Sequence, residues 1–219
     1  AQLNCATELL DRAVAEGRGE RLCIQAPGIR WTYAELQVKA NRIAHVLVQD
    51  MGLVPGNRVL LRAPNSPMLA ACWFAVVKAG GIAVGSMPLL RAKELKQILD
   101  KAQISHALCD LRLADETAAS QQLPEVPAAD SPQLQQLRYF NDGSPEGLEA
   151  AMARQSATFT NVATAADDTC LMAFTSGTTG TPKGTMHFHR DVMAACACWP
   201  PHVLRPDADD VFIGSPPLA

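Results

Sequence analysis

The sequence predicts an α/β fold in which a mostly parallel sheet is flanked by helices. Three observations support this class: apolar segments of strand length alternate with helical segments, each unit takes about 25 residues, and turn residues separate the units. Parallel strands need a crossover connection, which a helix supplies. Because 48% of the 219 residues are hydrophobic, the chain also has enough apolar side chains for a sizeable core.

A hairpin and a capped helix are expected in the first part of the chain. Pro27 and Gly28 stand between two short apolar segments, and this pattern predicts a turn at the edge of the sheet. Thr32 followed by Glu35 is a capping box, in which each side chain satisfies a free backbone donor of the helix start. Apolar residues then recur on one helical face before Gly52: Leu36, Ala40, Ile43, Ala44 and Leu47.

The remaining elements follow in chain order. Ser66 and Pro67 are predicted to start an apolar helix over 68–79, which stops at a Gly-Gly pair. A later helix has an apolar face made of Leu95, Ile98, Leu99 and Ala102. Strands are expected at 57–62, 82–84, 105–109, 138–140, 170–174 and 185–188. The polar stretches 121–136 and 161–168 are predicted to be surface connections.

The composition argues against several classes of protein. A net charge of −3 and a pI near 5.9 do not suit a surface for nucleic acid or for an anionic membrane. The longest apolar run, 68–77, is too short to span a bilayer, and no signal-peptide pattern stands at the N-terminus. We therefore expect a cytoplasmic protein without nucleic-acid or membrane partners.

The cysteines and histidines do not suggest a disulfide framework or a metal site. The seven cysteines are scattered and odd in number, so all seven are predicted to be reduced core residues. They are Cys5, Cys23, Cys72, Cys109, Cys170, Cys196 and Cys198. His187 and His189 would share one face of a strand, but no Cys, Asp or Glu lies at matching spacing. We predict no metal-binding residue, and a helix-capping role for His189.

Residues 175–184, TSGTTGTPKG, are the best candidate for a chemical function. Glycines allow the backbone to bring successive N–H groups close to an anion, and such a concave nest binds phosphate oxygens. Hydroxyl groups add neutral donors, and Lys183 adds a mobile positive charge. The segment lacks the Walker A pattern, since Pro182 precedes the lysine and Gly184 follows it. We expect it to join two strands and to bind phosphate; a ligand-free surface turn is the alternative.

The loop resembles the signature of the adenylate-forming superfamily, which contains acyl- and aryl-CoA synthetases, luciferases and peptide-synthetase adenylation domains. The match is gapless from Met172 to Lys183. Residues 31–36 resemble the first core motif of the family, 77–89 resemble the second, and 214–219 resemble the start of the next. The resemblance covers the whole chain, which is less than half of a typical member. It implies an incomplete N-terminal adenylation domain without the C-terminal domain. Residues 1–163 would form a first α/β subdomain, and residues 164–219 would contain the phosphate loop and the start of a second subdomain.

The resemblance also implies a function. Such enzymes use ATP and Mg²⁺ to turn a carboxylic acid into an acyl-adenylate, and then pass the acyl group to coenzyme A. The residues that match ATP phosphate-binding positions are Thr175, Ser176, Gly177, Thr178, Thr179, Gly180 and Lys183. No catalytic residue is assigned within these 219 residues, so we expect the chain alone to be inactive. A homo-oligomer is possible, because a sheet cut at this point exposes apolar surface.

The segments 87–91 and 184–191 look most like those of benzoate and 2-aminobenzoate CoA ligases, so an aromatic acid is the expected substrate. Two alternatives remain open. The parent enzyme could be an aliphatic acyl-CoA synthetase or an amino-acid adenylation domain. The chain could also be a non-catalytic module that binds a nucleotide or a protein partner.

Overall fold

The computed structural model of this protein describes residues 1–123, 134–175 and 182–214. Within them, six strands form one sheet in the order β6-β5-β3-β4-β7-β8. The strands are β3 (Arg58–Arg62), β4 (Ile82–Ser86), β5 (His106–Asp110), β6 (Gln136–Phe140), β7 (Thr169–Thr175) and β8 (Lys183–Phe188). All neighbouring pairs are parallel except β7 and β8. The predicted α/β class with a mostly parallel sheet is confirmed.

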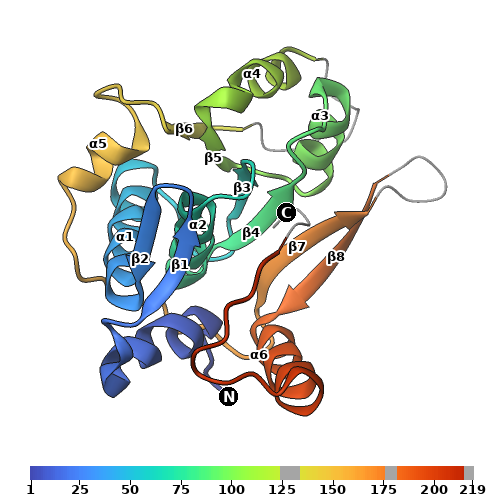
Figure 1. Ribbon diagram of the computed structural model, residues 1–219. Helices are drawn as coiled ribbons and strands as arrows, with labels where there is room; N and C mark the ends of the chain where they lie inside the picture. The colour runs from blue at the N-terminus through green and yellow to red at the C-terminus, as the bar shows by residue number, and fades with distance from the viewer. Residues whose placement is uncertain (124–133, 176–181, 215–219) are drawn as a thin grey trace.

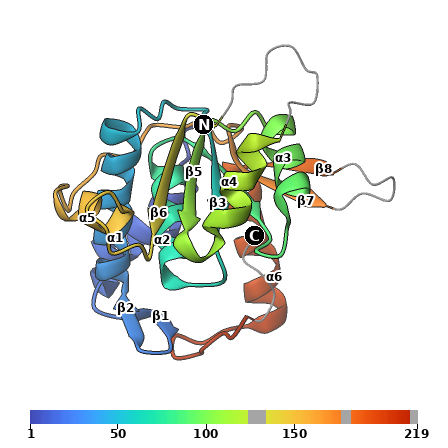
Figure 2. The same cartoon turned by 90° about the horizontal axis from the view of Figure 1, so that it is seen from above.

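Helices cover both faces of this sheet (Figures 1 and 2). The helices are α1 (Tyr33–His45), α2 (Pro67–Lys78), α3 (Ala92–Lys101), α4 (Ala114–Gln122), α5 (Leu148–Ala153) and α6 (His189–Trp199). Helices α1, α2 and α5 lie on one face, while α3 and α4 lie on the other (Figure 2). Shorter helical turns lie at Thr7–Asp11, Val14–Arg18, Val46–Asp50, Leu111–Leu113 and Pro200–Leu204.

Alternation along the strands divides the core between the two faces. On β3, Val59 and Leu61 pack with α1 and α2, whereas Leu60 packs with α3. On β5, Leu108 packs on the side of α1 and α2, and Ala107 packs on the side of α3. Successive strand side chains point to opposite faces, so each central strand contributes to two apolar clusters. This explains why the sequence of each central strand is a continuous apolar run.

The helix starts form as the sequence predicts. The Thr32 hydroxyl accepts from the backbone N–H of Glu35 at 3.2 Å, and the Glu35 carboxylate accepts from the N–H of Thr32 at 2.8 Å. The Ser66 hydroxyl accepts from the N–H of Leu69 at 3.2 Å and begins α2. Both caps satisfy backbone donors that a helix leaves free at its N-terminus.

The predicted hairpin forms, but its predicted place is wrong. Strands β1 (Leu22–Ala26) and β2 (Ile29–Thr32) pair antiparallel with each other in a separate two-stranded sheet. Cys23, Ile24 and Trp31 pack against the apolar cluster that contains α1 and α2. The hairpin therefore covers helices, and the edges of the described main sheet are β6 and β8.

The loop at 175–184 does connect two strands, as predicted, since β7 precedes it and β8 follows it (Figure 1). Because β7 also pairs with β4, the described sheet continues from the first part of the chain into the second. The proposed division at residue 163 stays a prediction. Of the connection predicted at 121–136, residues 124–133 lie outside the described residues.

Candidate functional site

The predicted phosphate loop is carried by the β7–β8 hairpin. Pairing runs to Thr175 opposite Lys183, and both side chains are exposed. The other predicted phosphate-binding residues lie outside the described residues: Ser176, Gly177, Thr178, Thr179 and Gly180. The structure thus describes the base of the loop, where Thr175 and Lys183 face each other across the two strands. The phosphate-binding role stays a prediction.

Gly184 lies close to a side chain of the neighbouring strand in this hairpin. It pairs with Phe174 on β7, and a Cβ atom at position 184 would lie 3.0 Å from Cζ of the Phe174 ring. Phe174 is half-buried and packs against the cluster formed by α3, β3 and β4. A side chain at this position would have to displace the ring by a few tenths of an ångström, so glycine favours the close crossing of β8 over Phe174.

The carboxyl ends of the five parallel strands meet at one edge of the sheet. Arg62, Ser86, Asp110 and Thr175 are the last residues of β3, β4, β5 and β7. Open α/β sheets bind ligands at this edge. The predicted phosphate loop and the segment after β4 therefore lie on the side of the sheet where the fold most often places a binding site.

Arg62 fixes the segment that follows β4. Its side chain is fully buried, and its guanidinium donates to the carbonyl oxygens of Met87 at 3.1 Å, Pro88 at 3.3 Å and Leu90 at 2.8 Å. Burial lowers the pKa of Arg62, but a guanidinium stays charged at neutral pH. Three carbonyl partners hold the chain in one path, so the arginine is a structural clamp at the carboxyl edge.

Asp110 is also satisfied within the fold. Its carboxylate accepts from Arg112 Nε at 2.8 Å, Arg112 Nη2 at 2.7 Å and Asn141 Nδ2 at 2.7 Å. Burial alone would raise the pKa of Asp110, but the hydrogen bonds from Arg112 and Asn141 keep it below the usual value. The carboxylate has donors on both oxygens, which indicates a structural role.

The segment that resembles the second core motif forms a joint between a helix and a strand. Helix α2 ends at Lys78, and Gly80 and Gly81 lead directly into β4. Gly80 has a φ of +73°, and a Cβ atom there would lie 2.9 Å from Cγ1 of Val162. The Gly-Gly joint therefore allows the 161–168 connection to pass close to the end of α2.

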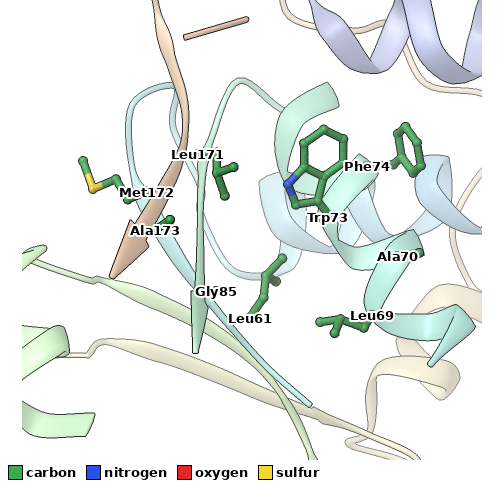
Figure 3. Close-up of a pocket in the computed structure, with 9 residues that line it drawn as sticks. All are labelled: Leu61, Leu69, Ala70, Trp73, Phe74, Gly85, Leu171, Met172 and Ala173. Atoms are coloured by element: carbon green, nitrogen blue, oxygen red, sulfur yellow. The ribbon is translucent and has the colours of Figure 1, made fainter. Parts of the chain in front are cut away.

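An apolar cavity of about 330 Å³ lies between α2 and the strands β3, β4 and β7 (Figure 3). Its lining residues are Leu61, Leu69, Ala70, Trp73, Phe74, Gly85, Leu171, Met172 and Ala173. None of these side chains is charged, so the cavity suits an apolar group and offers no counter-ion to a carboxylate. Sequence patterns did not indicate it, because its walls come from four separate elements.

A second feature missed by the sequence is a cluster of Cys5, Cys170 and His189. Their Sγ, Sγ and Nδ1 atoms all lie within 4.8 Å of one another, and all three residues are buried. His189 is the first residue of α6, but the predicted capping role is wrong. The Asp191 carboxylate accepts from the Phe188 N–H at 2.9 Å, while the His189 ring contacts Cys5 at 3.2 Å.

The prediction for the cysteines is wrong at two positions. Cys5, Cys72, Cys109 and Cys170 are buried, and Cys23 is half-buried. Cys196 and Cys198 are exposed on α6, where His189 is the only buried residue among those described. Burial was predicted from the residue type and the scattered spacing of the cysteines, and neither shows which face of a helix packs on the fold. No described helix is both long and apolar enough to cross a membrane.

Comparison with curated proteins finds CoA ligases. A 3-hydroxybenzoate/4-hydroxybenzoate–CoA ligase of Thauera aromatica is 30% identical over 201 residues, covering 88% of this chain and 36% of that protein. A benzoate–CoA ligase of the same organism is 26% identical, covering 98% and 40%. A long-chain-fatty-acid–CoA ligase of Mycobacterium tuberculosis is 30% identical, covering 90% and 37%. The chain thus spans less than half the length of these relatives.

Comparison with solved structures gives the same fold. An anthranilate CoA ligase in complex with anthranoyl-AMP superposes with a TM-score of 0.82 at 24% identity, covering 92% of this chain and 38% of that one. ATP-bound MatB from Rhodopseudomonas palustris superposes with a TM-score of 0.75 at 28% identity, covering 89% and 36%. A family model described as AMP-binding enzyme matches residues 10–219. The chain therefore belongs to the AMP-binding enzyme family.

Proposed function

We propose that this chain is the N-terminal part of an ATP-dependent acid–CoA ligase. The observation that carries the proposal is the loop motif at 175–184, set on the β7–β8 hairpin at the carboxyl edge of the sheet. The relatives named above as CoA ligases support it, as does the match of the family model over residues 10–219.

The proposed reaction has two steps. A carboxylate oxygen of the acid attacks the α-phosphorus of ATP, the bond to pyrophosphate breaks, and an acyl-adenylate forms. The sulfur of coenzyme A then attacks the acyl carbon, and AMP leaves. The first step brings an anion to a highly charged phosphate chain, so groups that neutralise the phosphates lower its barrier.

Within this chain, the proposed role is to hold the phosphates. Thr175 and Lys183 stand at the two ends of the loop base, with Ser176, Gly177, Thr178, Thr179 and Gly180 between them (the seven predicted phosphate-binding residues). Backbone N–H groups and hydroxyls would donate to the β- and γ-phosphate oxygens, and the ammonium of Lys183 would offset charge on the leaving pyrophosphate. Mg²⁺ would enter with ATP, and we assign it no ligand in this chain.

For the acid, we propose an aromatic carboxylate such as benzoate or 2-aminobenzoate. Segments 87–91 and 184–191 support this choice, and two of the relatives are named as benzoate or hydroxybenzoate ligases. An aliphatic acid is the second candidate, because a long-chain-fatty-acid ligase is also 30% identical. An amino-acid adenylation domain is the third.

Pyrophosphate exchange into ATP by the full-length protein tests the proposal. Exchange that depends on added acid, and is fastest with benzoate or 2-aminobenzoate, is the expected result. Faster exchange with acetate, a fatty acid or an amino acid would contradict the aromatic assignment. Failure of every acid to support exchange would favour a non-catalytic nucleotide- or partner-binding module.

A further inference from the structure

We propose that Cys5, Cys170 and His189 form a binding site for one thiophilic d¹⁰ metal ion, such as Cu(I) or Zn(II). The three residues come from parts of the chain that are far apart in sequence. Cys5 precedes the helical turn Thr7–Asp11, Cys170 is near the start of β7, and His189 begins α6. We call them the Cys–Cys–His cluster.

The geometry of the cluster fits a small metal ion. The two sulfur atoms and the imidazole nitrogen all lie within 4.8 Å of one another, and Cys5 Sγ lies 3.2 Å from His189 Nδ1. Ligands bound at metal–sulfur distances of about 2.3 Å and metal–nitrogen distances of about 2.0 Å lie roughly 3.5 to 4 Å apart. Small side-chain adjustments would therefore bring all three atoms onto one ion.

The surroundings of His189 favour the neutral ring that a metal ligand needs. Burial lowers the pKa of His189, although Asp168 opposes this effect. The backbone N–H of Cys5 donates to Nδ1 at 3.2 Å, which places the ring proton on Nε2. The lone pair of Nδ1 thus points toward the cluster, and binding exchanges this long hydrogen bond for a coordinate bond.

The two thiols are the soft ligands that Cu(I) and Zn(II) prefer. The hydrogen bond between the two thiols, together with burial, raises the pKa of Cys5, and the same hydrogen bond lowers the pKa of Cys170. Binding therefore forms two metal–sulfur bonds and one metal–nitrogen bond, and it releases the two thiol protons to solvent. No electron is transferred in this step.

The cluster is surrounded by apolar side chains. Ala6 and Val77 are fully buried in the same apolar cluster, and Leu171, Val192 and Met193 pack against it. An apolar shell strengthens metal–thiolate attraction because the local dielectric constant is low.

A bound metal would join the two ends of the β7–β8 hairpin. Cys170 stands at the start of β7, and His189 directly follows β8. Cys5 lies in the segment 1–6, which is tied to the chain before β7 by the bonds from Leu3 N to Thr164 O and from Ala166 N to Ala1 O, both 2.9 Å.

The test is the metal stoichiometry of the full-length protein under anaerobic conditions. Cu(I) would be titrated in competition with bicinchoninate, and Zn(II) with a chromophoric chelator. The parent should bind one more equivalent of at least one of these ions than the variant C5S/C170S. The matched control C72S/C109S, which removes two other buried thiols, should bind as much as the parent. His189→Gln should weaken binding at least about 10-fold.

Equal stoichiometry in the parent and in folded C5S/C170S would overturn the proposal, as would equal loss in the control variant. If C5S/C170S does not fold, X-ray absorption spectroscopy of the metal-loaded parent protein identifies the ligands of the ion. Two sulfur ligands and one nitrogen ligand in the first shell, with the nitrogen signal absent in His189→Gln, support the site. Any other ligand set overturns it.

Discussion

The two halves of the main sheet differ in how completely they are buried. The first half is β6-β5-β3-β4, and the second half is the β7–β8 hairpin with α6 after it. All five residues of β5 are buried, together with most of β3 and β4, because helices cover both faces. On the other side, four of the six residues of β8 are exposed, and α6 has one buried residue. The first half therefore supplies the stability of the described fold.

The second half projects from it and carries the predicted phosphate loop (Figure 1). Large apolar side chains stay exposed there, including Met186 at 58%, Trp199 at 56% and Phe212 at 65%. Within the described chain, stability and the proposed ATP binding therefore reside in different parts. Substitutions should separate them, and the predictions below test that separation.

The largest effect is expected in the central strands. Leu108→Ala removes a side chain that is fully buried in β5, so the free energy of unfolding should fall by about 3 kcal/mol. Met186→Ala on β8 is the matched change, and it should alter this energy by less than about 0.5 kcal/mol. Urea denaturation measures both. Similar losses in the two variants would contradict the proposed division of stability.

The next effect concerns Lys78, which is 1% exposed at the end of α2. Its ammonium pairs with both carboxylate oxygens of Asp11, with Nζ–Oδ2 at 2.6 Å. Burial lowers the pKa of Lys78, and the hydrogen bond and charge of Asp11 oppose this shift. Lys78→Met leaves Asp11 without its cation and should cost about 2 kcal/mol of unfolding free energy.

The double variant Asp11→Asn/Lys78→Met is the control for Lys78, because it removes the unpaired charge as well. It should unfold at a higher urea concentration than Lys78→Met alone. A double variant that is less stable than the single one would show that Asp11 contributes through other contacts.

A smaller effect is expected at the first capping box. Thr32→Ala removes the acceptor for the Glu35 N–H and should lower the free energy of unfolding by about 1 kcal/mol. Thr160→Ala, at an exposed threonine outside any helix or strand, serves as the control. Thermal unfolding of both proteins measures the difference, and an equal midpoint shift would exclude the cap as its cause.

The smallest effect is a pH dependence from His106 in β5. Burial lowers its pKa, only partly offset by the hydrogen bond with the Met51 carbonyl at 2.9 Å. Above about pH 6.5 the ring is neutral in both states, whereas below it the unfolded state binds a proton that the folded site disfavours. The midpoint of thermal unfolding should therefore fall on acidification, less steeply in His106→Gln. Identical pH profiles would contradict this assignment.

Local patterns predicted much of this fold. The capping box of Thr32 and Glu35 depends on four consecutive residues, and the strands follow from short apolar runs, so both are visible in the sequence. The clamp from Arg62 to Met87, Pro88 and Leu90 was not predicted, because the arginine looks like any charged residue at the end of a strand.

Long-range partners account for what the sequence did not predict. His187 and His189 are close in the sequence and were considered as a pair. In the fold, His189 instead contacts Cys5, which is 184 positions away. Cys196 and Cys198 were predicted to be buried because free cysteine is usually a core residue, but residue type does not show whether another element covers the site, and both are exposed. The phosphate loop was predicted from its motif and from the order of the motifs along the chain. Five of its seven predicted residues lie outside the described part.

The most direct test of the central claim is the equilibrium affinity for ATP. It would be measured by calorimetry on the full-length protein and on the variant Lys183→Ala/Thr178→Ala, with Lys101→Ala/Thr160→Ala as the matched surface control. The loop variant should bind ATP at least about 10-fold more weakly, because it loses a cation and a hydroxyl donor at the phosphates, while its thermal midpoint stays that of the parent. Unchanged ATP affinity in the loop variant would contradict the assignment of this hairpin as the phosphate-binding site.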